Sequence, residues 1–181
     1  MKKVVNKSAI KLSCIGFLFL CFFARAQNTT DGQISKIRET VAKINKDSGY
    51  TIKAFNQEDF MEYPTDNGGD MKAYYKDGKL LKIVEGTGFS SCENTTEYYF
   101  DRGKLIFVYD QESNAPYNDS TTDFNFNKTT LTRECRFYFY NEKLIKSVLK
   151  GNSRCGGEAR VELATQDLEE SVRLRKFLSK H

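Results

Sequence analysis

The sequence predicts an α+β fold: an antiparallel β-meander of three hairpins, with an N-terminal and a C-terminal helix packed on one face. Near both ends of the chain, apolar residues recur at steps of three and four, the period of an amphipathic helix. Between residues 71 and 150 the period changes to two, the period of a strand, and two-residue turn signals interrupt it. We expect residues 27–181 to form this single domain.

Residues 1–26 have the pattern of a secretory signal peptide. A basic segment over residues 1–11 precedes 12 apolar or small residues, and Ala24-Arg25-Ala26 supplies the small residues that signal peptidase recognises. The apolar run is shorter than the roughly 20 residues that a helix needs to cross a bilayer. We therefore expect cleavage before Gln27, no stable membrane insertion afterwards, and a periplasmic or secreted protein.

Charge and composition narrow the range of partners and chemistries. The chain has 28 basic and 24 acidic side chains, but five basic and no acidic ones lie in residues 1–26, which leaves 23 against 24. A domain with this balance gives no electrostatic support for a nucleic-acid partner. The single histidine is the last residue, His181, so His-based catalysis has no evident residues. We expect no enzymatic activity and no cofactor.

A helix is expected at each end of the domain, over residues 31–48 and 166–179. Thr30 and Gln33 fit a capping box before the first helix. Its apolar stripe consists of Ile34, Ile37, Val41 and Ile44. Thr165 can cap the second helix, in which acidic residues come first and basic residues last, as the helix dipole favours.

Three turn dipeptides, each followed by Lys-Leu, define the expected hairpins: Asp77-Gly78, Arg102-Gly103 and Asn141-Glu142. Asp-Gly is the strongest signal, because both central residues of a two-residue hairpin turn adopt positive φ, and Asn-Glu is the weakest. A polar loop over residues 110–130 separates the second hairpin from the third in this 71–150 sheet.

Two-residue turns assign side chains to two faces of the sheet. One face would pair Tyr75 with Leu80, Phe100 with Leu105, and Phe139 with Leu144, and would form the core together with Val84, Phe107, Phe137 and Val148. The other would pair Tyr74 with Leu81, Tyr99 with Ile106, and Tyr138 with Ile145, and we expect it to stay accessible. Any binding surface is then expected at Tyr74, Tyr99 and Tyr138, near Lys79, Lys104 and Lys143. The alternative is ordinary sheet surface, where each Tyr packs on its cross-strand neighbour.

The segments Tyr74–Leu80 and Tyr98–Leu105 resemble the hairpin repeat of MORN-variant proteins, some of which serve as bacterial antitoxins. Together with the two helices, most of the mature chain is similar to small uncharacterised exported proteins of Bacteroidota-type bacteria. The third unit departs from the repeat, since it has Asn141-Glu142 where a glycine is expected. The resemblance implies an inhibitor or immunity-type function as one possibility.

Three cysteines remain after the expected cleavage, namely Cys92, Cys135 and Cys155. Because Cys135 enters the fifth strand of the expected meander and Cys155 follows the adjacent sixth strand, we expect a disulfide between them, and leave open whether Cys92 is free or paired. Three thiols without a histidine fall short of the four ligands of a structural zinc site, so no metal is expected.

The leading functional hypothesis is an exported, non-enzymatic interaction module of the bacterial cell envelope, with an envelope protein or a polysaccharide as its partner. An inhibitor or immunity-type protein that blocks an enzyme is the alternative. A third hypothesis is a hydrolase that uses carboxylates such as Glu93, Glu97 and Asp101, because paired acids need no fixed spacing in the sequence.

Overall fold

The computed structural model describes residues 29–155 and 161–181, so the expected signal peptide, residues 1–26, lies outside the described residues. The chain divides into two compact units, residues 1–36 and 37–181, and the second contains the sheet. A helix over residues 29–46 precedes the sheet, against an expected 31–48. Among the described helices, none has the length and apolarity needed to span a membrane.

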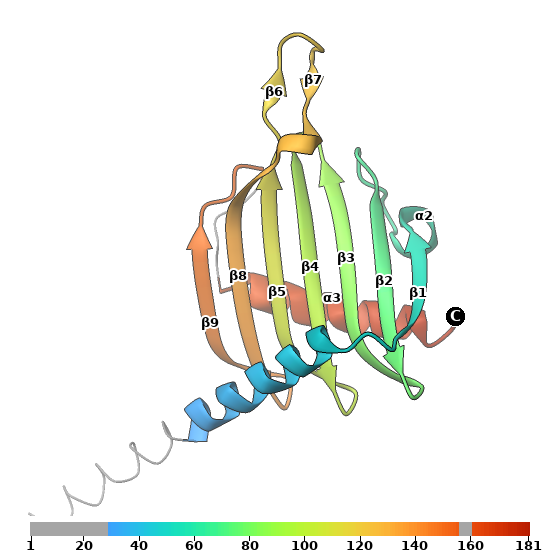
Figure 1. Ribbon diagram of the computed structural model, residues 1–181, viewed down its shortest axis with the longest axis vertical. Coiled ribbons are helices and arrows are strands. Elements are labelled where there is room, and N and C mark those ends of the chain that lie inside the picture. The colour runs from blue at the N-terminus through green and yellow to red at the C-terminus, as the bar shows by residue number, and fades with distance from the viewer. Residues whose placement is uncertain (1–28, 156–160) are drawn as a thin grey trace, which may run out of the picture. The chain divides into compact units, whose positions relative to one another are not determined.

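Seven antiparallel strands form one sheet in the order β1-β2-β3-β4-β5-β8-β9 (Figure 1). Their bounds are β1 Thr51–Asn56, β2 Gly69–Lys76, β3 Lys79–Phe89, β4 Cys92–Asp101, β5 Lys104–Asn114, β8 Thr130–Tyr140 and β9 Lys143–Gly151. Each strand pairs with the next one along the sheet path, which makes a meander and confirms the α+β prediction. No strand was predicted over residues 51–56, so β1 is the strand of this sheet that the sequence pattern did not reveal.

The remaining elements connect or cover the sheet. They are α2 Gln57–Phe60, β6 Tyr117–Asn118, β7 Asp123–Phe124, a 3-10 helix at Phe126–Lys128, and α3 Leu163–Leu178. The strands β6 and β7 form a separate ribbon beyond the end of the main sheet (Figure 1). The connection between β5 and β8 is thus residues 115–129, shorter than the expected polar loop over 110–130, because both strands extend into it.

All three hairpins have the two-residue turns that the sequence predicts, including the weakly predicted third. Both turn residues have positive φ in each hairpin: 50° and 71° at Asp77-Gly78, 51° and 75° at Arg102-Gly103, 50° and 61° at Asn141-Glu142. The expected pairs of Tyr75 with Leu80, Phe100 with Leu105 and Phe139 with Leu144 are also present, each as the second pair from its turn.

A bulge follows this second pair in every hairpin, and it corrects the predicted faces. Tyr99 pairs with Phe107 and not with Ile106, and the same one-residue shift pairs Tyr74 with Lys82 and Tyr138 with Lys146. An extra residue on one strand reverses the alternation beyond it. Phe107 therefore contacts Tyr99 and Tyr138, with ring centroids 5.7 and 4.9 Å apart, and leaves the face on which it was expected.

The same shift moves two more residues off the expected core face. Val84 pairs with Glu97 while its neighbour Ile83 enters the core, and Val148 pairs with Arg136. Leu144, also expected in the core, is 38% exposed because β9 is an edge strand.

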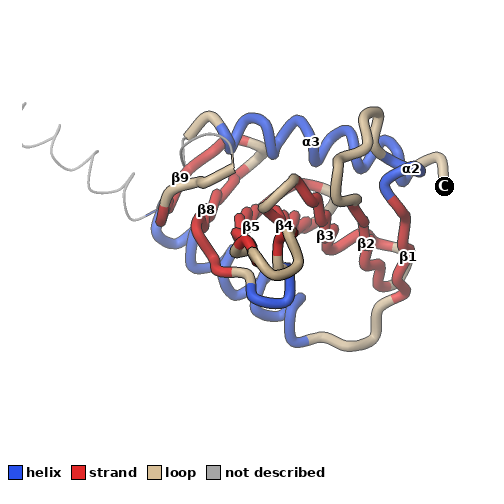
Figure 2. The backbone as a smooth tube through the Cα atoms, turned by 90° about the horizontal axis from the view of Figure 1, so that it is seen from above, coloured by secondary structure: helices blue, strands red, loops and turns tan. Residues whose placement is uncertain are grey.

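The helix α3 lies along one face of the sheet (Figure 2). Its buried residues join the largest apolar cluster, which comprises Phe60, Met71, Ala73, Ile83, Tyr98, Phe100, Leu105, Val108, Cys135, Phe137, Phe139, Ala164, Leu174 and Leu178. Burial of this many large apolar side chains is the main stabilising contribution to the fold.

Residues 37–46 of the first helix contact the other face, so the expectation that both helices share one face is corrected. Arg38 Nε donates to the Tyr138 hydroxyl at 3.4 Å, and the Tyr99 hydroxyl donates to Asn45 Oδ1 at 2.9 Å. The physical reason lies in the bulges, because with Phe107 on the tyrosine face both faces carry large apolar side chains that need cover.

Candidate functional site

The predicted tyrosine surface is not accessible in the structure. Tyr99 and Tyr138 are 1% and 4% exposed, and Tyr74 is half-buried with its ring packed edge-on against Tyr50 at 5.8 Å. The hydroxyl of Tyr99 is held between Asn45 and Glu97, and burial raises its pKa well above the ordinary value. The alternative, a sheet surface on which each Tyr packs on Leu81, Ile106 or Ile145 across the hairpin, is not observed either, because the bulges give these tyrosines other partners and two of them are buried.

The three predicted lysines, in contrast, are exposed and share one end of the sheet. Lys79, Lys104 and Lys143 each follow a hairpin turn directly. Lys104 Nζ lies 3.2 Å from Asn141 Oδ1, which joins the second turn to the third. The structure therefore separates the predicted site: its lysines lie at the turn end, whereas Tyr99 and Tyr138 contact residues 37–46 and Tyr74 packs against Tyr50.

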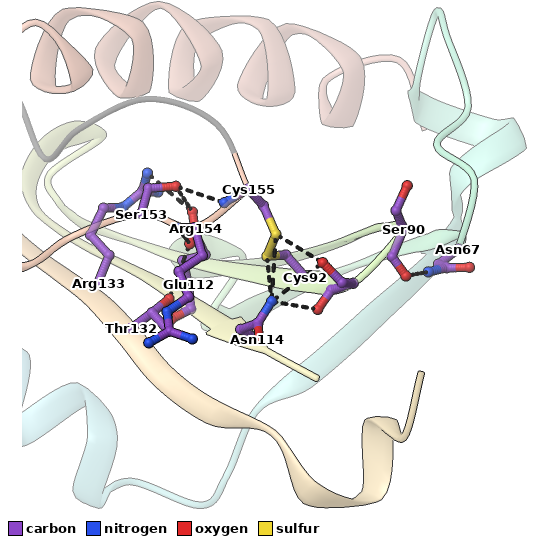
Figure 3. Close-up of a disulfide and its surroundings, with 11 residues drawn as sticks. Asn67, Ser90, Cys92, Glu112, Asn114, Thr132, Arg133, Ser153, Arg154 and Cys155 are labelled. Atoms are coloured by element: carbon purple, nitrogen blue, oxygen red, sulfur yellow. Dashed lines mark hydrogen bonds and ion pairs between the residues drawn. A yellow bond between two sulfur atoms is a disulfide. The ribbon is translucent and has the colours of Figure 1, made fainter. Parts of the chain in front are cut away.

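The disulfide joins Cys92 to Cys155, with Cα atoms 6.1 Å apart, and corrects the predicted Cys135–Cys155 pairing. Cys135 is free and buried, because it lies in mid-strand opposite Asp110 and Leu149 with its side chain in the core. After β9, residues 152–155 turn back across the sheet end towards the start of β4 (Figure 3). Burial raises the pKa of the Cys135 thiol to about 11, which keeps it protonated and unreactive.

Buried polar contacts hold the segment that carries Cys155. Glu112 accepts hydrogen bonds from the Thr132 hydroxyl at 3.0 Å and the Arg154 backbone N–H at 2.8 Å, and a short one from the Ser153 hydroxyl (Figure 3). These bonds lower the pKa of Glu112 against the opposing effect of burial. Because buried polar groups need partners, this carboxylate fixes the path of the chain into the disulfide.

Residues around the disulfide are poorly arranged to bind a metal ion. The ligand atoms of Cys92, Glu112 and Cys155 lie within 4.8 Å of one another. However, the two sulfurs are bonded to each other, and Glu112 accepts its three hydrogen bonds while its Oε2 lies 3.5 Å from Arg133 Nη1. A thiolate must be free to act as a ligand. The geometry therefore fits a structural role, in which the disulfide and Glu112 hold the segment that carries Cys155.

The carboxylates of the hydrolase hypothesis lie apart. Glu93 and Asp101 are exposed near opposite ends of β4, which places their backbones about 27 Å apart at the rise of an antiparallel strand. Glu97 lies between them and forms an ion pair with Lys82 at 3.1 Å. Glycosidase carboxyl pairs are roughly 5–10 Å apart, so Glu93 and Asp101 do not form such a pair.

Two other carboxyl groups have strongly perturbed acidity. Burial raises the pKa of Glu85 to about 7, and Glu85 accepts a hydrogen bond from the buried Tyr98 hydroxyl at 3.2 Å. Burial also raises the pKa of Asp167 to about 8, and its Oδ2 atom has no hydrogen-bond partner in the part of the chain that the structure describes. Their pattern in the sequence gave no sign of this, because α3 brings Asp167 to the sheet from a distant segment.

A cleft of about 720 Å³ opens where the first two hairpin turns meet the end of α3, and we call it the turn-end cleft. It is lined by Tyr75, Gly78, Lys79, Leu80, Leu81, Phe100, Asp101, Arg102, Gly103, Arg175, Leu178 and Ser179. Tyr75, Leu80 and Leu81 are half-buried, so they present partly exposed apolar walls. Small-ligand sites typically have volumes of roughly 300–1,000 Å³ and are mainly apolar, with few polar groups.

Arg175 is the polar anchor of this cleft, and α3 holds it in place. Its Nη1 donates to the Gly103 carbonyl at 2.7 Å, and its Nε donates to the Ser171 carbonyl at 3.3 Å. The guanidinium carbon lies 5.5 Å from the centroid of the Phe100 ring, within the range of a cation–π contact. With Nη2 near Glu142 at 3.3 Å, three of the five N–H groups are engaged and two remain for a ligand.

Sequence reasoning found Lys79 in this site and missed Arg175. In the sequence, Arg175 is one of several basic residues near the C-terminal end of a helix. Basic residues are favoured there by the helix dipole, so their presence does not indicate a binding site. Only the crossing of α3 over the turn ends of β2–β5 distinguishes it from Lys176 next to it.

A second cleft, of about 1000 Å³, lies at the opposite end of the sheet beside the β6–β7 ribbon. It contains Tyr117 and Phe124, whose rings pack edge-on with centroids 5.4 Å apart, together with Leu131 and Arg154. Its lining is more polar and more exposed than that of the turn-end cleft.

No protein-family model, curated protein sequence or solved structure matches this chain. The likeness to MORN-variant hairpins therefore stays a prediction, and the candidate site is defined by its own geometry.

Proposed function

We propose that the protein is an exported, non-enzymatic interaction module of the bacterial cell envelope and that it binds its partner at the turn-end cleft. The observation that carries this proposal is the cleft itself, in which half-buried apolar walls meet a fixed arginine. Partly exposed apolar surface of this kind commonly marks a binding site.

The disulfide supports an extracytoplasmic location. Disulfides persist in oxidising compartments and are rare in the cytosol, and the Glu112 hydrogen bonds hold the segment that carries Cys155. This agrees with the basic and apolar pattern of residues 1–26.

The placement of the ionisable groups favours binding over hydrolysis. Glu93, Glu97 and Asp101 are spread along β4, as described above, and the buried Glu112 and Asp110 are partners of Arg133. These two carboxylates are committed to internal ion pairs, which leaves them poorly placed to act on a substrate.

Affinity capture from envelope extract tests the proposal. The double variant Lys79→Glu/Arg102→Glu changes two exposed cleft residues, and the matched control Lys128→Glu/Lys146→Glu makes the same charge change elsewhere. We expect the cleft variant to lose the captured partner and the control to retain it. Equal capture by both variants would refute the cleft as the binding site.

The identity of the captured partner separates the two remaining functions. If it is an enzyme whose turnover falls when this protein is added, the inhibitor function is favoured. A partner whose activity is unaffected, or a polysaccharide, favours the interaction module.

A further inference from the structure

The turn-end cleft has two chemically distinct parts. Its floor is formed by the buried Phe100 and Leu178, beside the half-buried Leu80. Its charged side chains are mainly cationic: Lys79, Arg102 and Arg175 against the single acid Asp101. An apolar floor with a cationic rim is complementary to a ligand that has an apolar body and an anionic head.

Arg175 is arranged to receive a planar anion. Its guanidinium group is held by the Gly103 and Ser171 carbonyls and by the Phe100 ring, so little conformational freedom is lost when a ligand binds. The guanidinium fork matches a carboxylate better than a lysine ammonium does, and charge-assisted hydrogen bonds of this kind are strong. An exposed ion pair such as that between Arg175 and Glu142 is weak, so it competes little with a ligand.

We infer that the turn-end cleft binds a long-chain carboxylate, a ligand of the fatty-acid class, with its alkyl chain against Leu80, Phe100 and Leu178 and its carboxylate at Arg175. This inference rests on the proposed function, since it names the ligand class for the same site. An uncharged apolar peptide would leave the cationic rim without a partner, and a small polar anion would leave the half-buried apolar walls at Tyr75, Leu80 and Leu81 in contact with water.

Calorimetric titration with octanoate, decanoate and dodecanoate, each below its micelle concentration, tests the inference on protein purified from cells that express the full chain. We expect one saturable site, whose affinity rises about 16-fold for each two-carbon step, since a buried methylene contributes about fourfold. No saturable binding of dodecanoate by the folded protein, or an affinity independent of chain length, would overturn the inference.

Variants on α3 test the position of the head group. Arg175→Gln is expected to weaken dodecanoate binding by about tenfold or more and to leave dodecanol binding within twofold. Lys176→Gln is the matched control, because it removes one charge from the adjacent exposed residue outside the cleft. Equal effects of the two variants on dodecanoate would contradict the assignment of Arg175.

A second variant covers the case in which Arg175→Gln fails to fold. Lys79→Gln/Arg102→Gln removes two rim charges from exposed turn residues without altering α3, and a several-fold loss of dodecanoate affinity is expected. An unchanged affinity would count against the cationic rim.

The two proposals fail separately. If the cleft variants lose a captured envelope partner while dodecanoate does not bind, the ligand class is wrong and the proposed function stands. If dodecanoate binds in an Arg175-dependent manner while capture is unaffected by the cleft variants, the ligand class stands and the cleft is not the site of the captured partner.

Discussion

Asp167 is a side chain whose ionised form destabilises the folded protein. Its Oδ2 atom is shielded from water without a hydrogen-bond partner among the described residues. Burial is the main reason that its pKa is raised to about 8, and the nearby Asp110 and Glu85 act in the same direction while Arg133 opposes them. The folded protein therefore binds a proton that the unfolded chain releases near pH 4.

The first prediction concerns the pH dependence of stability. Because the folded pKa of Asp167 is raised, stability is highest below pH 4 with respect to this group and falls as pH rises to about 8. Asp167→Asn should flatten the decline, and its stabilising effect should grow with pH. Urea denaturation at pH 5, 6, 7 and 8 measures it, with the exposed Asp123→Asn as control. An identical pH slope in wild type and Asp167→Asn would refute the assignment.

The backbone of Glu142 is strained, since it adopts φ 61° at the turn position where the other two hairpins have glycine. For an L-residue, the left-handed region costs about 1–2 kcal/mol. Gly78 and Gly103 avoid this cost.

The second prediction is that Glu142→Gly stabilises the protein by about 0.5–1 kcal/mol. The change also removes the exposed ion pair with Arg175, which contributes little. Glu142→Ala is the matched control, because it loses the same ion pair and keeps a Cβ at positive φ. Urea midpoints should rank Gly above wild type and Ala at or below it; an alanine variant as stable as the glycine variant would argue against backbone strain.

At the scale of elements, the disulfide connects β4 to the segment after β9. Cys92 and Cys155 are 63 residues apart in the sequence, and closing a loop of this length in the unfolded chain corresponds to about 4 kcal/mol in the chain-entropy model.

The third prediction is that Cys155→Ser lowers the free energy of unfolding by up to about 4 kcal/mol, while Cys135→Ser leaves the crosslink in place. Peptide mapping without reduction should yield a Cys92–Cys155 peptide, and Cys135 should be alkylated only after unfolding because it is buried. Recovery of a Cys135–Cys155 peptide would contradict this prediction and support the pairing that was expected from strand order.

The turns were predictable from sequence and the bulges were not, and the reason is physical. Turn formation depends on the φ preferences of two adjacent residues, which identify Asp77-Gly78, and the Lys-Leu pair after each turn extends the assignment to Asn141-Glu142. A bulge depends on how two strands pair, and nothing in the alternation of residues 104–109 distinguishes Phe107 as facing Tyr99. Likewise, Cys135 and Cys155 look equally available until the path of residues 152–155 is known.

For the whole molecule, the main consequence is a sheet that residues 37–46 contact on one face and α3 covers on the other. The candidate site follows from this arrangement, since α3 leaves the turn ends of β2–β5 partly uncovered. Sequence reasoning identified the lysines at the turns but placed the site on a face that the first helix occupies, because which helix covers which face is decided by long-range packing.

The fourth prediction is a pattern of tyrosine nitration by tetranitromethane. Tyr63 and Tyr117 are 79% and 54% exposed and should react first. Tyr99 and Tyr138 should be protected by residues 37–46, and burial also raises the pKa of Tyr99, which suppresses its reactive phenolate. Mass spectrometry of the digested protein locates the nitrated residues. Nitration of Tyr138 as fast as Tyr117 would show that the first helix does not cover this face in solution.

The disulfide also determines how the domain would respond to mechanical tension. A force applied at residues 37 and 181 reaches the loop between Cys92 and Cys155 at its two ends, which the sulfur–sulfur bond joins. The backbone of β4, β5, β8 and β9 lies within this loop and cannot be extended by that force. The two cysteines are 63 residues apart, so at about 3.5 Å per extended residue the disulfide prevents about 220 Å of chain from being extended. Under tension, unfolding of the oxidised molecule would therefore extend β1–β3 and α3 and go no further, whereas the reduced molecule would unfold to full extension.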